Sequence, residues 1–304
     1  MLTNVFTKTI RDRWLGWMIA VVCLMLLILY GMAVYRQMDL SILTSMPEAY
    51  VALIGIREDV DAGGLAVGAI QGLYGAITLA AMALAMGGSA IAGEEREGTM
   101  GILLGNPKGR THVLISKLGA MVVLAASSVL ILWGAVYGIA AMLGVEIGGL
   151  DVEALSLHMF CNVLFYGFLA TAISAWTGNR GAAAGVTAAV LVLSFFAVGL
   201  LPLIEGLKEL VKAFPWYYFD GSDPVYNGIN WGHLGVLVAG AAVFAAIAVI
   251  GVNRRDLKGQ SVGVTLIDRL RGNPLTRKVI GQLAGSARVS SIWLKAASEY
   301  QGLL

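Results

Sequence analysis

The chain has 304 residues, of which 58% are hydrophobic and only 13% are charged, and its mean hydropathy is +0.79. Soluble domains carry about 25% charged residues, so this composition excludes a water-soluble protein and makes lipid the solvent for most of the chain. The net charge of +2 gives no indication of nucleic-acid binding.

Six long segments without Asp, Glu, Lys or Arg follow one another along the chain. Each exceeds the roughly 20 residues that a helix needs to cross the hydrocarbon core. Because continuous apolar runs lack the alternation of a membrane β-barrel, the sequence predicts an all-α integral membrane protein with six transmembrane helices. The predicted spans lie near 15–35, 64–92, 118–144, 155–178, 181–202 and 231–252.

The basic residues predict the orientation of these spans. Of the 21 Lys and Arg residues, only Arg36, Arg57, Lys208 and Lys212 fall in segments on one side, and all the others fall on the opposite side. Basic residues near span ends are retained in the cytoplasm, and an even number of spans brings both chain ends to the same face. The N- and C-termini are therefore predicted to be cytoplasmic, with the first span acting as an uncleaved insertion signal.

A dense polar segment that begins Glu94-Glu95-Arg96-Glu97-Gly98-Thr99 separates the second and third predicted spans. Acidic residues are favourable in the first turn of a helix. Met100, Leu103 and Leu104 then fall on one apolar face, and Pro107 ends the helix. The pattern predicts a short amphipathic helix that offers its apolar face to a soluble partner. The alternative is an ordinary polar loop folded on the protein's own surface.

The residue spacings exclude several chemistries. The two cysteines lie inside predicted spans, and the three histidines lie in different segments without ligand spacing, so neither a catalytic residue nor a metal site is predicted. Residues 104–111 resemble a phosphate-binding P-loop, but Leu104 and Arg110 stand where the first Gly and the Lys are required. No cofactor is expected in this chain. The central parts of the spans hold no Asp, Glu or Lys that could couple transport to an ion, so an external motor is inferred.

The segment after the second span resembles that of ABC exporter permeases of the type-2 (ABC-2) family. The match falls on Glu95, Glu97, Gly98, Thr99, Leu103, Leu104, Pro107, Arg110 and Lys117. An N-terminal amphipathic helix at 4–14 and the Arg255-Asp256-Leu257 triplet are similar too, and the resemblance covers about residues 1–258. It implies ABC-2 exporter permease architecture, with a cytoplasmic amphipathic helix leading into the membrane and a cytoplasmic coupling helix.

In that family the coupling helix docks on a soluble ABC ATPase subunit, which binds ATP and Mg and supplies the energy. The resemblance implies that role for Glu94, Glu95, Glu97, Gly98, Thr99, Leu103, Leu104, Pro107 and Arg110. The expected function is the permease subunit of an ABC exporter in the plasma membrane, itself not an enzyme, which moves a lipophilic or amphipathic substrate (drug, antibiotic, peptide or lipid) outward. The alternative is a six-span membrane scaffold or sensor without transport activity.

The segment between the fifth and sixth spans is predicted to be a helix at the outer interface, because apolar residues from Leu203 to Phe214 recur at helical spacing. An aromatic cluster follows it. In type-2 permeases a corresponding element caps the exit, which implies an outer gate at Leu207, Phe214, Trp216 and Tyr217; an aromatic belt without a gating role is the alternative.

The sequence also bears on helix packing, on assembly and on the C-terminal segment. Small residues at four-residue steps along 64–80 predict close helix packing. Six spans are half of the twelve that an ABC exporter core usually needs, so a second permease copy or half is implied. The predicted domains are the permease at 1–258 and a basic cytoplasmic amphipathic tail at 259–304. The tail lies along membrane lipid or starts a second permease repeat.

Overall fold

The computed structural model describes residues 4–39, 46–54, 61–96 and 109–255, and this part of the chain is helical without a β-strand. Six helical segments within it are long and apolar enough to cross a bilayer, which confirms the predicted all-α membrane fold. They are Val5–Tyr35 (α1), Ala62–Ser89 (α3, η2 and α4), Arg110–Leu143 (α7), Val152–Thr177 (α8), Arg180–Leu203 (α9 and η3) and Trp231–Arg254 (α12).

Shorter helices lie between these spans. They are α2 (Glu48–Ile54), α5 (Ala92–Arg96), η4 (Lys208–Ala213), α10 (Pro215–Asp220) and α11 (Pro224–Asn227). Within the compound spans, the bounds are Ala62–Leu65 for α3, Ala66–Gly75 for η2, Ala76–Ser89 for α4, Arg180–Leu200 for α9 and Leu201–Leu203 for η3.

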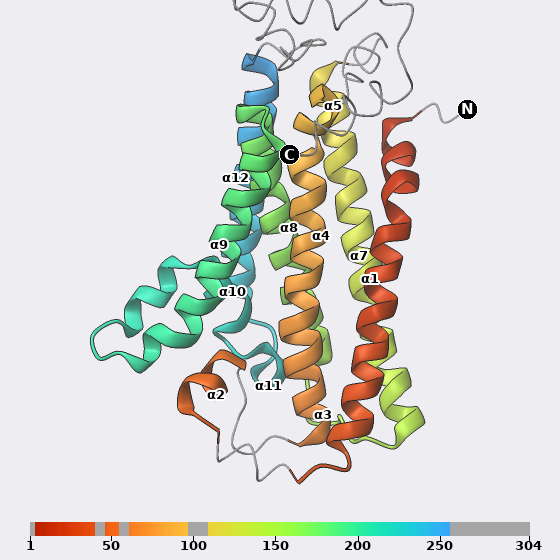
Figure 1. Cartoon of the computed structure of the whole chain (residues 1–304), viewed down its shortest axis with the longest axis vertical. Helices are drawn as coiled ribbons and strands as arrows, with labels where there is room; N and C mark the ends of the chain where they lie inside the picture. The colour runs from red at the N-terminus through yellow and green to blue at the C-terminus, as the bar shows by residue number, and fades with distance from the viewer. Residues whose placement is uncertain (1–3, 40–45, 55–60, 97–108, 256–304) are drawn as a thin grey trace, which may run out of the picture. The chain divides into compact units, whose positions relative to one another are not determined.

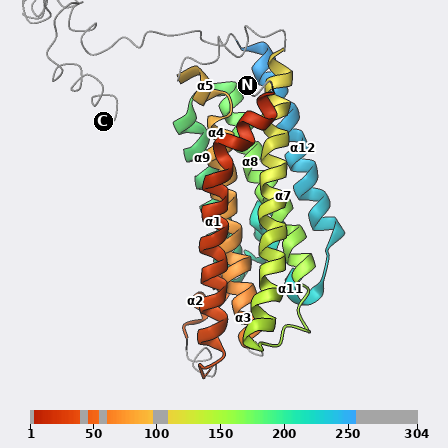
Figure 2. The same ribbon diagram turned by 90° about the vertical axis from the view of Figure 1, so that its right-hand side faces the viewer.

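The spans run in alternating directions and form one bundle (Figure 1). We call the end where α1 begins and α12 ends the near end, and the opposite end the far end. α8 lies inside the bundle and packs most extensively against α4 and α12, whereas α1 packs against α7. Figure 2 shows α1 and α7 side by side along the bundle. α8 is also among the most buried spans, and α9 is the most exposed.

Asparagine and aspartate side chains fix where most of the spans begin. Each of them accepts a hydrogen bond from a backbone N–H two or three residues further on, which satisfies a donor that has no partner inside the helix. These N-cap residues are Asn4, Asp61, Asp151, Asn179 and Asn230. The limits of the spans are therefore set by side-chain chemistry as well as by hydropathy.

Two helices differ from the sequence-based expectation. The predicted N-terminal amphipathic helix at 4–14 is not a separate element, because it continues without a break into the first span as the 31-residue α1. The single helix predicted over Leu203–Phe214 is wrong: two short 3-10 segments, η3 and η4, occupy this region. Gly206 lies between them with φ of 84°, a left-handed conformation that a continuous right-handed helix does not contain.

The second span contains an element that its composition did not indicate. Its middle part, η2, is a π-helix of 10 residues. A Cβ on Gly68 would meet no atom within 4 Å, whereas one on Gly72 would lie 3.7 Å from Leu155. Of the predicted small-residue ridge, Gly64, Gly72, Ala76 and Ala80 are buried and Gly68 is half-buried.

The closest backbone contact between this span and α8 lies at Gly87, where α4 packs against α8. A Cβ there would overlap the carbonyl oxygen of Gly167 and lie 2.7 Å from Thr171 Oγ1. The neighbouring Gly88 is less crowded, since its Cβ would find its first neighbours at 3.5 Å and 3.6 Å. Gly87, not Gly88, permits the two backbones to approach.

We expect Gly87→Ala to destabilise the bundle by about 1–3 kcal/mol, because the overlap involves backbone that cannot rotate away. The matched control, Gly88→Ala, adds the same methyl group to the same helix and leaves stability within about 0.5 kcal/mol of wild type. Unfolding in mixed detergent micelles measures both changes. Equal stability of the two variants would contradict this packing description.

Candidate functional site

A short helix at the near end carries the first predicted site residues. After α4 the chain turns and forms α5, which holds Glu94 and Glu95. The buried hydroxyl of Ser174 in α8 bridges this turn: it donates to the Gly88 carbonyl oxygen at 2.9 Å and accepts from Ala92 N–H at 3.2 Å. Since backbone groups at helix ends lack partners within their own helix, α8 fixes the position where α5 starts.

Glu94 forms an ion pair with Lys117 of α7. The Lys117 Nζ lies 2.6 Å from Glu94 Oε1 and also donates to the Ala90 carbonyl oxygen at 2.7 Å. Lys117 is only 8% exposed, so its ammonium group is largely removed from water. A charge in this position is stable only with a hydrogen-bonded partner. The pair therefore fastens α5 to α7.

Glu95 forms a second ion pair, with Arg255 at the end of α12. Arg255 Nη2 lies 2.6 Å from Glu95 Oε2, and the Glu95 side chain is 7% exposed. Arg110, at the start of α7, donates from Nη1 to the Arg255 carbonyl oxygen at 2.9 Å. Two adjacent carboxylates thus connect one short helix to two different spans.

Gly178 leaves room for the second pair. It ends α8 in the left-handed conformation, with φ of 60°. A Cβ at this position would overlap the guanidinium of Arg255 and lie 2.8 Å from Glu95 Oε2. Both the backbone conformation and the close approach favour glycine, so the end of α8 is part of the site.

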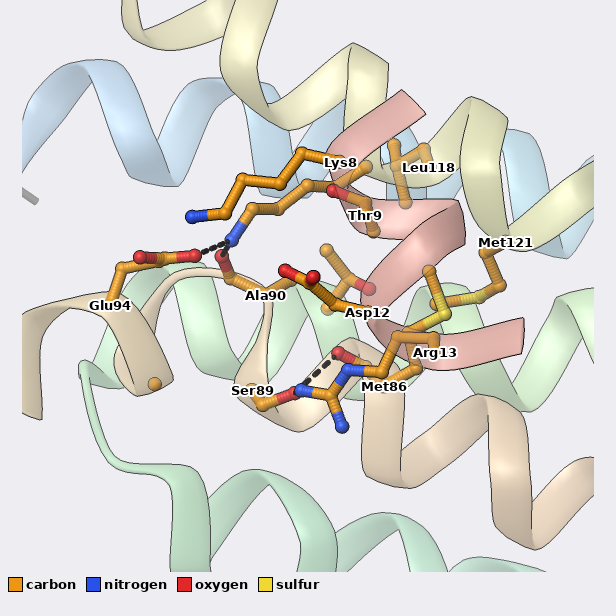
Figure 3. Close-up of a pocket in the computed structure, with 13 residues that line it drawn as sticks. Lys8, Thr9, Asp12, Arg13, Met86, Ser89, Ala90, Glu94, Leu118 and Met121 are labelled. Carbon is orange, nitrogen blue, oxygen red and sulfur yellow. Dashed lines mark hydrogen bonds and ion pairs between the residues drawn. The ribbon is translucent and has the colours of Figure 1, made fainter. Parts of the chain in front are cut away.

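A recess of about 270 Å³ lies beside the Glu94–Lys117 pair, between α1, α4 and α7. The first turns of α1 form one wall, and Figure 3 shows Asp12 and Arg13 facing the end of α4 at Ser89. Arg13 Nη2 donates to Ser89 Oγ at 2.9 Å. α1 is thereby joined to the end of α4, just before the turn that leads into α5.

The structure brings together three predicted coupling residues, Glu94, Glu95 and Arg110. The others lie outside the described residues: Glu97, Gly98, Thr99, Leu103, Leu104 and Pro107. Sequence reasoning missed the anchoring roles of Ser174 and Arg13. A serine in an apolar span and one basic residue among many give no signal of their partners, which lie 82 and 76 positions away.

The predicted gate residues at the far end differ in their burial. Trp216 is buried in α10, and its backbone N–H donates to Ser194 Oγ of α9 at 2.8 Å. Tyr217 and Phe214 are half-buried, and Leu207 is exposed. The gate assignment stays a prediction, and the structure adds that α10 is anchored on α9.

Comparisons with known proteins agree on one family. Residues 3–257 match the family described as ABC-2 family transporter protein. The chain is also 31% identical over 185 residues to a protein of Stutzerimonas stutzeri named "Probable ABC transporter permease protein NosY". That alignment covers 56% of this chain and 67% of the relative.

A double-mutant cycle tests whether the Glu94–Lys117 pair holds α5 in place. Lys117→Met leaves the Glu94 carboxylate without its cation in a largely buried position, and Glu94→Gln leaves the ammonium without its anion, so each variant is expected to be destabilised. The double variant should be less destabilised than the sum, with a coupling energy of about 1–3 kcal/mol. Unfolding in mixed micelles gives the free energies.

The exposed pair between Lys212 and Glu209 in η4 provides the control cycle. Its atoms are 2.5 Å apart, but the side chains are 55% and 84% exposed. Glu209→Gln and Lys212→Met should therefore couple by less than about 1 kcal/mol. Similar coupling energies for the two pairs would show that burial does not strengthen the Glu94–Lys117 contact.

Proposed function

Because the chain belongs to the ABC-2 family of transporters and is the transmembrane component of an ABC transporter, we propose that it is the permease subunit of an exporter. It moves a lipophilic or amphipathic substrate, such as a drug, an antibiotic, a peptide or a lipid, outward across the plasma membrane. The energy comes from ATP and Mg bound by a separate ABC ATPase subunit. The lack of acidic residues or Lys in the central parts of the spans supports an external source of energy.

We place the near end in the cytoplasm. The described basic residues gather there, with Arg36, Lys208 and Lys212 as the exceptions at the far end. An excess of Lys and Arg near the span ends marks the cytoplasmic side of a membrane protein. With the near end inside, the polar segment after α5 faces the compartment that contains ATP.

The paired carboxylates of α5 are the observation that carries the coupling proposal. The segment 97–108 docks on the ATPase through its apolar face, and α5 joins this segment to the bundle. When the ATPase moves the segment, the Glu94–Lys117 pair transmits the displacement to α7 and the Glu95–Arg255 pair transmits it to α12. Since both pairs are short and substantially buried, they resist stretching more than exposed contacts do.

At the far end, α10 is the candidate for the outer gate. Its anchor on α9 through Ser194 gives it a fixed support, and its aromatic side chains suit the headgroup region. A second permease copy or half completes the transport unit. The tail at 259–304 either lies along lipid or begins a second permease repeat.

Co-reconstitution of the chain with its ABC ATPase subunit in liposomes tests the proposal. We expect the wild-type chain to stimulate ATP hydrolysis, and Glu97→Lys or Leu103→Asp to reduce the rate to that of the ATPase alone, because each change disrupts the docking helix. Glu209→Lys is the matched control: it makes the same charge reversal at the far end and should leave stimulation intact.

Two results would count against coupling through this segment. Full stimulation by Glu97→Lys and Leu103→Asp would remove the docking role. A wild-type chain that inserts normally but leaves ATP hydrolysis unchanged would favour the alternative of a scaffold or sensor.

A further inference from the structure

A groove on the lateral surface of the bundle runs between α7 and α8. Its volume is about 310 Å³. Trp133 and Leu130 form the α7 wall, and Leu157 and Phe160 form part of the α8 wall. Leu130 is 63% exposed, so the groove opens on the surface that would face lipid rather than the bundle interior. Its shape and lining suit an apolar chain.

One carboxylate lines this otherwise apolar groove. Glu153 lies in the first turn of α8 at the far end, and the Tyr137 hydroxyl donates to its two oxygens at 2.9 Å and 3.1 Å. Tyr137 is a neutral donor, so it orients the carboxylate without balancing its charge. Within the described part of the chain, neither Lys nor Arg forms an ion pair with Glu153.

Two aromatic side chains of α7, Trp133 and Tyr137, lie beside Glu153. The Trp133 ring lies in the groove wall, and Tyr137 packs edge-on against it with ring centres 5.8 Å apart. Aromatic faces attract ammonium groups, and the attraction is strongest where water is partly excluded. A carboxylate, indole and phenol rings and an apolar slot together suit a molecule with a cationic head and an aliphatic tail.

We infer that the groove binds an amphipathic organic cation, with its ammonium head beside Glu153 and its tail along α7 and α8 toward Phe160. This inference rests on the proposed transport function. It narrows the proposed substrate class to cationic amphiphiles that reach the protein from the lipid phase. The charge of Glu153 opposes an anionic amphiphile of the same shape.

The inner wall of the groove is connected to the second span. Ser156 lines the groove, and its Oγ accepts a hydrogen bond from Gln71 Nε2 of the π-helical segment η2 at 3.1 Å. Gln71 itself is fully buried. A ligand in the groove therefore lies against a residue that is hydrogen-bonded to η2, which gives the site a physical contact with the bundle interior.

Photolabelling of the purified full chain in dodecyl maltoside micelles tests the site. The probe is an alkyl trimethylammonium with a diazirine at the end of its chain, and the matched probe carries the same chain on a neutral glucoside head. We expect the cationic probe to label residues 126–160 saturably and the glucoside to label them weakly. Glu153→Gln should lower the affinity for the cationic probe about tenfold and leave the glucoside unchanged.

Two further variants keep the test independent of folding defects. Leu130→Trp fills the exposed slot and should reduce labelling by both probes. Glu209→Gln removes an exposed carboxylate elsewhere at the far end and should change neither. Because no ATPase is present, failure of ATP-driven transport would leave the labelling result standing, and failure of labelling would leave the coupling proposal standing.

Three results would overturn the cation site. The first is equal labelling by the cationic and neutral probes, and the second is unchanged affinity in Glu153→Gln. The third is displacement of the probe by phosphatidylcholine as effectively as by unlabelled alkyl trimethylammonium, which would identify the groove as an ordinary lipid contact.

Discussion

Two neighbouring carboxylates on a five-residue helix, α5, bind cations from two different spanning helices. Glu94 pairs with Lys117 of α7, and Glu95 pairs with Arg255 at the end of α12. Both contacts are substantially buried, so separating either pair exposes an uncompensated charge to a poorly hydrated environment. α5 consequently cannot shift without moving α7, moving α12 or breaking an ion pair. In the proposed function, this constraint makes the near end the place where the ATPase moves the bundle.

The remainder of the bundle supports that arrangement. α8 provides the hydroxyl of Ser174 that positions α5, the glycine end at Gly178 that admits Arg255, and the backbone that approaches Gly87 of α4. Each of these contacts involves only a few atoms. They are needed because, in lipid, every backbone and polar group must find its hydrogen-bond partner within the protein. α8 therefore acts as the internal support, while α1 and α9 present more of their surface to lipid.

Hydropathy predicted the spans well because a continuous apolar segment in lipid satisfies its backbone hydrogen bonds only as a helix. The limits of the spans depend on Asn and Asp caps, which are readable from sequence. The predicted amphipathic helix at 4–14 is not separate, because it forms the first turns of α1. The π-helix η2 was not predictable, because its hydrogen-bond register depends on neighbouring helices. Of the candidate site, the sequence pattern drew attention to Glu94 and Glu95, and their coupling role stays a prediction. The resemblance also includes their partners Lys117 and Arg255, but nothing in the sequence shows which cation pairs with which carboxylate across 23 and 160 positions.

We propose that the α5 carboxylates transmit movement of the ATPase to α7 and α12. Spin labels at the exposed near-end positions Arg11 and Arg254 report the distance between α1 and α12 in the complex with the ATPase. On binding of a non-hydrolysable ATP analogue, we predict a changed distance in the wild type. In Glu94→Gln/Glu95→Gln, with the ATPase still bound, we predict no change. The same change of distance in that variant would contradict transmission through these ion pairs.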